Sequence, residues 1–194
     1  MWPLRGQSLR RALQVKPSVM RAYQWNQATA MTTAEFMAFA KANEPWFRGR
    51  LPESEATLAA AEATLGVKLP QSLRWLLQGW GYWHGTAVSS LSDTVRDTIE
   101  ARRVHGLPGE FIILENFHDG GLILVDTRDE PSPGEPALFW IGMEDLGENP
   151  RLEGNQRWVS YGEYVVEMLE TTRDVIPEGD VRYDRSQYPE GRDA

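Results

Sequence analysis

The stretch from Ser54 to Gly81 predicts two short helices joined by a tight turn, and this hairpin constrains the fold more than any other segment. Ser54 is a good N-cap, because its hydroxyl can accept a hydrogen bond from a free amide of the first turn. Gly66 suits a left-handed helix end, and Pro70 suits the first position of the second helix. Apolar residues recur at helical spacing on both sides of the turn, at Leu58, Ala61, Leu65, Leu73, Leu76 and Leu77. Such a hairpin indicates a binding module and carries no catalytic group.

Three short apolar runs farther along the chain predict β-strands. They are FIIL at 111–114, LILV at 122–125 and ALFWI at 137–141, with 157–160 as a candidate fourth strand. Gly120 and Gly121 favour an antiparallel pair between the first two runs, and helices are expected at about 89–104 and 161–171. We therefore predict an α+β fold, in which an antiparallel sheet of about four to six strands is flanked by N-terminal helices and a C-terminal helix. Because the runs are nearly continuous in apolar residues, both sheet faces should be partly covered.

The order of these features matches a known family. The matching features are Glu62 in the first helix, the Leu65-Gly66-x-x-Leu69-Pro70 junction, the leucine-rich second helix, the aromatic strand near Phe139 and Trp140, and the closing segment from Ser160 to Leu169. In this order the chain resembles the SUKH superfamily, also called the Smi1/Knr4 domain, over roughly residues 50 to 172. The resemblance implies a non-catalytic protein-binding module. Bacterial members are commonly immunity proteins that bind and neutralise a partner toxin, often a nuclease.

Residues 31–173 are expected to form a single globular domain that includes this family core. Thr32 and Glu35 match a capping box, so a helix of about ten residues should precede the core and pack Phe36 and Phe39 on it. Residues 1–30 predict a basic arm, and residues 174–194 predict a polar tail. The arm is open to two interpretations, an unstructured extension ahead of Met31 or an organellar transit peptide.

The composition narrows the classes of function. The chain has no cysteine, which excludes disulfides and thiolate chemistry and is compatible with a reducing cytoplasm. No run approaches the roughly 18 consecutive apolar residues that a membrane-spanning helix needs. We therefore expect a cytoplasmic protein without a membrane partner.

Known catalytic signatures are absent from the sequence, including phosphate-binding glycine loops, a nucleophile elbow and a His-Glu-x-x-His helix. We therefore expect no enzyme, no cofactor and no metal site. One alternative stays open, because His118 and Asp119 could join Glu115 and Asp126 in a divalent metal site or an unfamiliar catalytic site. A bare His-Asp dipeptide fixes neither the number of ligands nor their geometry.

Charge gives the main functional indication from the residues themselves. Residues 1–34 carry five basic and no acidic side chains, so the remaining 15 basic and 28 acidic residues leave a balance of −13 within a total of −8. Between Glu115 and Glu153 there are ten acidic residues against Arg128 and Arg151. Loops could present these carboxylates as one field that attracts a basic partner, although an ordinary solvated surface explains them equally well. An acidic surface does not favour nucleic acid as a direct ligand.

These observations lead to one main hypothesis, an immunity protein whose partner is a toxin with a basic surface. The predicted contact residues are Trp83, Asp126, Asp129 and Glu130, with Trp83 as an aromatic anchor. Trp75 and Trp80 are expected to fill the core instead of forming a stacking platform. The alternatives are a regulatory scaffold, as in the fungal members of the superfamily, and an enzyme with an unrecognised site.

Overall fold

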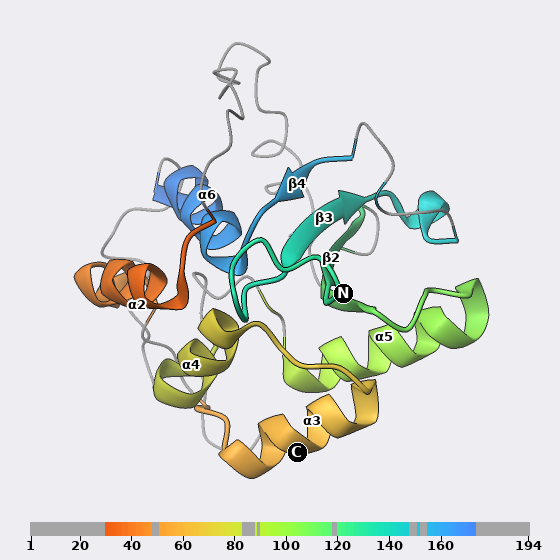
Figure 1. Ribbon diagram of the computed structural model, residues 1–194, viewed down its shortest axis with the longest axis horizontal. Helices are drawn as coiled ribbons and strands as arrows, with labels where there is room; N and C mark the ends of the chain where they lie inside the picture. The colour runs from red at the N-terminus through yellow and green to blue at the C-terminus, as the bar shows by residue number, and fades with distance from the viewer. Residues whose placement is uncertain are drawn as a thin grey trace, which may run out of the picture.

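The computed structural model describes residues 30–47, 51–82, 88, 90–117, 120–147, 151 and 155–173. In this part of the chain, five α-helices flank a four-stranded antiparallel sheet of order β1-β2-β3-β4 (Figure 1). The helices are α2 (Thr33–Ala42), α3 (Glu55–Leu65), α4 (Gln71–Trp80), α5 (Leu91–His105) and α6 (Tyr161–Arg173). The strands are β1 (Phe111–Asn116), β2 (Leu122–Asp126), β3 (Ala137–Ile141) and β4 (Arg157–Trp158). The predicted α+β fold is confirmed. The predicted arm, apart from Ala30, and the predicted tail lie outside the described residues.

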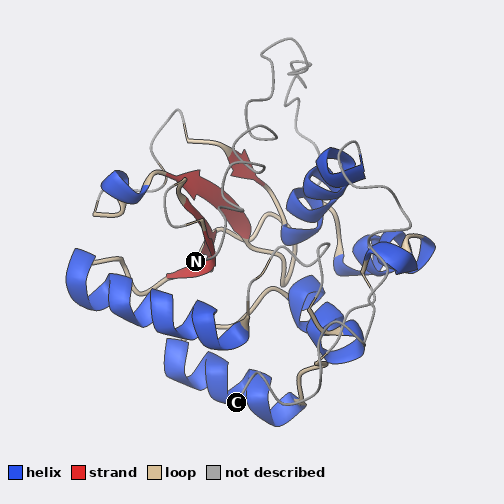
Figure 2. Ribbon diagram, turned by 180° about the vertical axis from the view of Figure 1, so that it is seen from behind, coloured by secondary structure: helices blue, strands red, loops and turns tan. Residues whose placement is uncertain are grey.

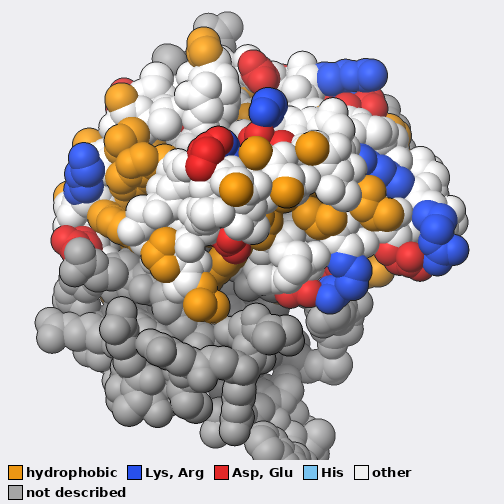
Figure 3. Space-filling model, turned by 90° about the horizontal axis from the view of Figure 1, so that it is seen from below, with side chains coloured by type: hydrophobic (Ala, Val, Ile, Leu, Met, Phe, Trp, Pro, Cys, Tyr) orange, Lys and Arg blue, Asp and Glu red, His pale blue; other side chains and the backbone are white. Residues whose placement is uncertain are grey.

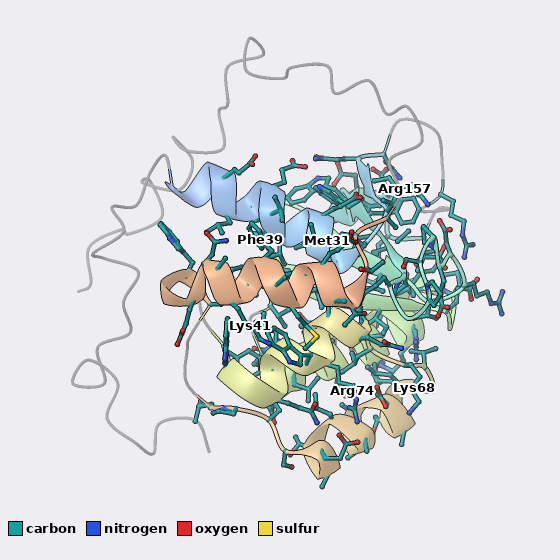
Figure 4. All side chains as sticks on the ribbon, turned by 60° about the vertical axis from the view of Figure 1, so that its left-hand side comes forward. Met31, Phe39, Lys41, Lys68, Arg74 and Arg157 are labelled. Carbon is teal, nitrogen blue, oxygen red and sulfur yellow. The ribbon has the colours of Figure 1, made fainter. Side chains whose placement is uncertain are left out.

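The helical hairpin forms as the sequence predicts. Ser54 caps α3 by accepting a 3.0 Å hydrogen bond from the amide of Thr57, and Gly66 ends the helix in a left-handed conformation with φ of 74°. Buried Glu62 holds the junction, because it accepts hydrogen bonds from Lys68 Nζ at 2.6 Å and from the amide of Leu69 at 3.2 Å. Arg74 reaches the same carboxylate at 3.8 Å, beside Lys68 (Figure 4). Glu62 thus has a structural role in fixing the angle between the two helices.

Helix α2 packs against α4 and α6. The predicted capping box is present between Thr32 and Glu35. Phe36 is fully buried and packs edge-on against Phe47, Trp75 and Tyr161. Phe39 is only half-buried and lies between α2 and α6 (Figure 4). Its ring lies 6.0 Å from that of Phe47, so both phenylalanines pack against the core as predicted, although Phe39 stays partly at the surface.

The sheet buries both faces, as its continuous apolar runs predict. Ile112, Val125, Leu138 and Trp158 join the core made with the helices. Phe111, Leu124 and Ile141 form a second, smaller core with Leu107 and Leu146 on the opposite face. Leu146 directly follows the short 3-10 helix η3 (Met143–Asp145), which lies away from α6 (Figure 2). The second face is therefore covered by Ala101 near the end of α5 and by the loops that follow α5 and β3.

Helix α5 covers the free edge of β1 with three side chains one turn apart. The hydroxyl of Thr98 accepts a 2.9 Å hydrogen bond from the amide of Ile113. Arg102 Nη2 donates to the carbonyl of Phe111 at 3.1 Å. The hydroxyl of Thr94 donates to the carbonyl of Leu114 at 3.5 Å, the limit of a hydrogen bond. These contacts protect an edge strand that would otherwise present unpaired backbone groups.

Candidate functional site

The predicted contact residues can be placed only in part. Trp83 lies outside the described residues, as do His118 and Asp119 of the alternative metal or catalytic site. The remaining three residues, Asp126, Asp129 and Glu130, all follow from the end of β2 and the loop after it. The structure thus brings three of the four contact residues to the same end of the sheet.

Asp126 is a buried structural carboxylate. Its side chain is 0% exposed, and its two oxygens accept hydrogen bonds from Arg151 at 2.5 and 2.8 Å. One of these oxygens also accepts the amide of Arg128 at 3.1 Å. The Arg151 guanidinium lies 4.7 Å from the ring centroid of Phe111, over the second core. Because Asp126 is fully buried and both of its oxygens are bonded to Arg151, a partner could bind this carboxylate only by displacing Arg151.

Asp129 and Glu130 lie nearer the surface. Asp129 is half-buried and accepts a 2.6 Å hydrogen bond from Arg157, and Glu130 is exposed. Arg128 pairs with Glu110 at 3.1 Å at the same end of the sheet. Acidic and basic side chains therefore alternate here, and the surface is a network of ion pairs instead of a purely negative field.

The other carboxylates between Glu115 and Glu153 that the structure describes lie apart from this network. The strand register pairs Asp126 with Ala137 at one end of the sheet and Leu122 with Ile141 at the other. Glu144 and Asp145 follow β3 and so lie at the far end. Glu135 is fully buried. Among the described residues, the acidic side chains are divided between two ends of the sheet and its interior, and they do not form a single face.

Glu135 also has a raised pKa. Its carboxylate accepts hydrogen bonds from Ser72 Oγ and Thr33 Oγ1, both at 2.5 Å, and from the Ser72 amide at 2.9 Å. Burial raises the pKa of this carboxyl above its ordinary value, and the three hydrogen bonds offset only part of that effect. A carboxyl that is completely enclosed and already holds two helices is a structural group, and it offers nothing to a partner.

Two tryptophans of α4 pack against the core, as the sequence predicts. The ring of Trp75 lies 5.4 Å from that of Trp80. Trp75 also packs against the ring of Phe36, and Trp80 packs against the ring of Phe47. Both indoles remain half-buried, and Lys41 lies 6.0 Å above Trp75, between α2 and α4 (Figure 4). Hydrophobic side chains gather on the α2 and α4 side of the molecule, whereas acidic and basic side chains alternate on the α5 side (Figure 3).

A polar cavity between α5 and β1 was not predicted. Its volume is about 140 Å³, and its polar lining comes from Asp93, Thr94, Arg96, Asp97, Glu115 and Asn116. Asp93, Arg96 and Asp97 share one face of a helix through their i, i+3 and i+4 spacing. That spacing is visible in the sequence, but it is equally typical of a solvated helix surface. What turns it into a cavity is the backbone of β1, which no sequence pattern reveals.

The described members of the alternative catalytic site do not converge. Glu115 pairs with Ile123, three residues from Asp126 along β2. Ile123 faces the helices, whereas Asp126 lies over the second core with Arg151. The two carboxylates are therefore on opposite faces of the sheet. In the part of the chain that the structure describes, no group of three or more potential ligands could hold a metal ion.

Among the described helices, none is both long and apolar enough to cross a membrane.

Comparison with known proteins identifies the family. No curated protein matches the sequence. The model of the SMI1 / KNR4 family (SUKH-1) matches residues 52–167, which is more than half of the chain and includes the hairpin, the sheet and most of α6. Domains of this family are known for protein-binding roles of the immunity type. The chain therefore belongs to the SMI1/KNR4 family (SUKH-1), as its motifs predict.

Proposed function

We propose that this protein is a cytoplasmic immunity protein that binds a cognate toxin and neutralises it without turnover. The observation that carries the proposal is the family match over residues 52–167. The net charge of −8 supports a partner with a basic surface, such as a nuclease whose cleft binds phosphates, because opposite charges speed association. An immunity protein of this kind would act by covering that cleft.

The proposed contact surface is the end of the sheet that carries Asp129 and Glu130, together with Trp83. Glu130 is exposed, and Asp129 is held in place by Arg157. Asp126 would contribute indirectly, because its ion pair positions Arg151 beside this surface. The exposed charges would set the association rate, while an aromatic anchor would contribute most of the affinity.

A regulatory scaffold is the second candidate. It is supported by the first 34 residues, which carry five basic side chains and no acidic one ahead of an acidic domain. A scaffold would bind several proteins of the same cell, whereas an immunity protein would bind one toxin. A toxin gene beside the gene for this protein would favour the immunity function.

The test is capture of the neighbouring toxin by the full chain at low and high salt. Glu130→Lys should weaken capture by roughly tenfold at low salt and less at high salt, because salt screens exposed charges. Glu144→Lys is the matched control, since Glu144 is also exposed but lies at the far end of the sheet. Trp83→Ala should weaken capture at both salt concentrations. Capture that is unchanged by Glu130→Lys, Trp83→Ala and salt would refute the proposed surface.

The enzyme alternative has its own test. His118→Ala combined with Asp119→Ala would abolish protection of the cell if these side chains performed catalysis. We expect protection to be unchanged, because stoichiometric binding needs neither group. Loss of protection by a variant that still folds and still binds the toxin would favour the enzyme.

A further inference from the structure

We propose that the cavity between α5 and β1 receives an arginine side chain of the protein partner. The inference rests on the proposed function for the existence of a basic partner, and it assigns to that partner a specific contact that lies apart from Glu130. Three features of the cavity support it: its shape, the groups that line it and the guanidinium that the chain itself already holds there.

The cavity results from an irregularity in β1. The pairing of β1 with β2 shifts between Ile113 and Glu115, so that Leu114 is an extra residue in a bulge. Thr98 is well bonded to Ile113 at 2.9 Å, but Thr94 is stretched to 3.5 Å from the Leu114 carbonyl. Helix and strand are therefore close at Thr98 and separate toward Thr94. The Leu114 carbonyl, which lines the opening, is left with a weak donor.

The size of the cavity limits its ligand. A volume of about 140 Å³ is well below the roughly 300 Å³ at which pockets begin to hold drug-sized molecules. A folded segment of a partner or a nucleotide would not fit. A single side chain with a polar head would fit.

The charges in the cavity select a cation. Three carboxylates line it, from Asp93, Asp97 and Glu115, against the one guanidinium of Arg96. Asp97 is only 15% exposed, and its second oxygen is fixed by Asn116 Nδ2 at 3.1 Å. Tyr164 is 1% exposed, and its hydroxyl has no hydrogen-bond partner among the described residues. Burial raises the pKa of this hydroxyl, and the charge of Glu115 adds to the rise.

The preference for a guanidinium over an ammonium follows from Arg96. Its Nη1 lies 2.5 Å from Asp93 and its Nε lies 2.8 Å from Asp97, so this pair of carboxylates already binds a guanidinium. The planar fork of arginine matches two acceptors at once, which the point charge of lysine does not. Arg96 is itself 64% exposed and is free to turn toward solvent. It acts as an internal competitor that a partner arginine would displace.

The test uses N-acetyl-arginine amide as the probe and the full chain as the receptor, with binding followed by NMR through the side-chain amide of Asn116. Arg96→Ala should tighten binding about two- to fivefold, because it removes an exposed competing ion pair. Asp97→Asn should weaken binding of the probe. Asp93→Asn should weaken it as well, and it serves as a second variant at a more exposed position where folding is not at risk. N-acetyl-lysine amide should bind more weakly than the arginine probe.

The matched controls lie one turn farther along α5. Glu100 and Arg103 form an exposed ion pair of 2.6 Å with the same i, i+3 spacing, but neither residue lines the cavity. Glu100→Gln and Arg103→Ala should leave binding of the probe unchanged. Equal effects of the control and cavity variants, or equal binding of both probes, would overturn the proposal by showing only general attraction to an acidic helix.

The site and the proposed function can fail separately. The probe needs no toxin, so absence of probe binding overturns the arginine site even if the toxin is captured. If the probe binds as expected, Asp97→Asn should also weaken capture of the toxin, and unchanged capture would overturn the assignment of this cavity to the partner. Complete loss of toxin capture in Glu130→Lys would bear only on the proposed function, because Glu130 does not line the cavity.

Discussion

The carboxylate of Glu135 accepts a 2.9 Å hydrogen bond from the backbone amide of Ser72 and thereby caps helix α4 from a loop 63 residues away. The N-cap residue of α4 is Pro70, whose side chain cannot accept a hydrogen bond. The same oxygen accepts the hydroxyl of Thr33 at 2.5 Å, at the start of α2. One buried carboxyl therefore joins two helices to the β2–β3 connection.

Removal of this carboxyl should destabilise the protein. Glu135→Ala deletes a helix cap and leaves the buried Ser72 groups without an acceptor, so we expect the free energy of unfolding to fall by about 3 kcal/mol. Urea unfolding followed by circular dichroism measures this change. Glu130→Ala is the control, because Glu130 is exposed in the same connection and should change stability by less than about 0.5 kcal/mol.

The pH dependence of stability should carry the signature of Glu135. Because burial raises its pKa in the folded protein, folding favours the protonated form. The stabilisation is complete below the ordinary pKa of the carboxyl and is lost as the pH rises through the raised value. The free energy of unfolding of the parent protein should therefore fall relative to that of Glu135→Gln as the pH rises above about 4.5. Urea midpoints of the two proteins measured at several pH values test this, and two parallel curves would contradict it.

The outcome at Glu135 and Asp126 shows what the sequence could predict. The helix caps and apolar stripes act within a few residues, so Ser54, Thr32 and Gly66 took the predicted positions. The sequence predicts surface charges at both carboxylates, because the partners that bury them are remote, 25 residues away for Arg151 and 63 for Ser72. The α5–β1 cavity depends on a bulge at Leu114, and an apolar run has the same pattern with or without a bulge.

The Asp126–Arg151 pair should contribute much more to stability than a surface pair. Arg151→Ala would leave the fully buried Asp126 without its cation, and we expect a loss of about 3 kcal/mol. Adding Asp126→Asn should restore part of this loss, since the uncompensated charge is then removed. Urea unfolding of the single and double variants measures both effects.

The matched control for this pair is Arg157→Ala. Arg157 is 37% exposed, like Arg151 at 38%, but its partner Asp129 is 39% exposed, whereas Asp126 is 0% exposed. Breaking an exposed pair costs at most about 1 kcal/mol. A similar loss in both arginine variants would contradict a special role for the buried carboxylate.

Helix α2 lies ahead of the family match, so its contacts with the family core decide whether it belongs to the folded unit. Gly162, the second residue of α6, lies directly against this N-terminal segment. A Cβ at Gly162 would come within 2.8 Å of Met31 Sδ and 3.2 Å of Phe36 Cδ2. Met31 has a flexible side chain that can move, but Phe36 is fully enclosed by three aromatic rings.

We therefore expect Gly162→Ala to displace α2 and to lower the free energy of unfolding by about 1 to 2 kcal/mol, the usual effect of overpacking a core. Gly79→Ala is the opposite control, because Gly79 lies in α4 with no atom within 4 Å of an added Cβ. Alanine there should stabilise the helix by up to about 1 kcal/mol. Trp75 contacts Phe36, so the NMR signal of its indole N–H reports on the position of α2. If α2 were only loosely attached, Gly162→Ala would change neither the unfolding midpoint nor this signal; a change in both, absent from Gly79→Ala, would show that α2 folds as one unit with the family core.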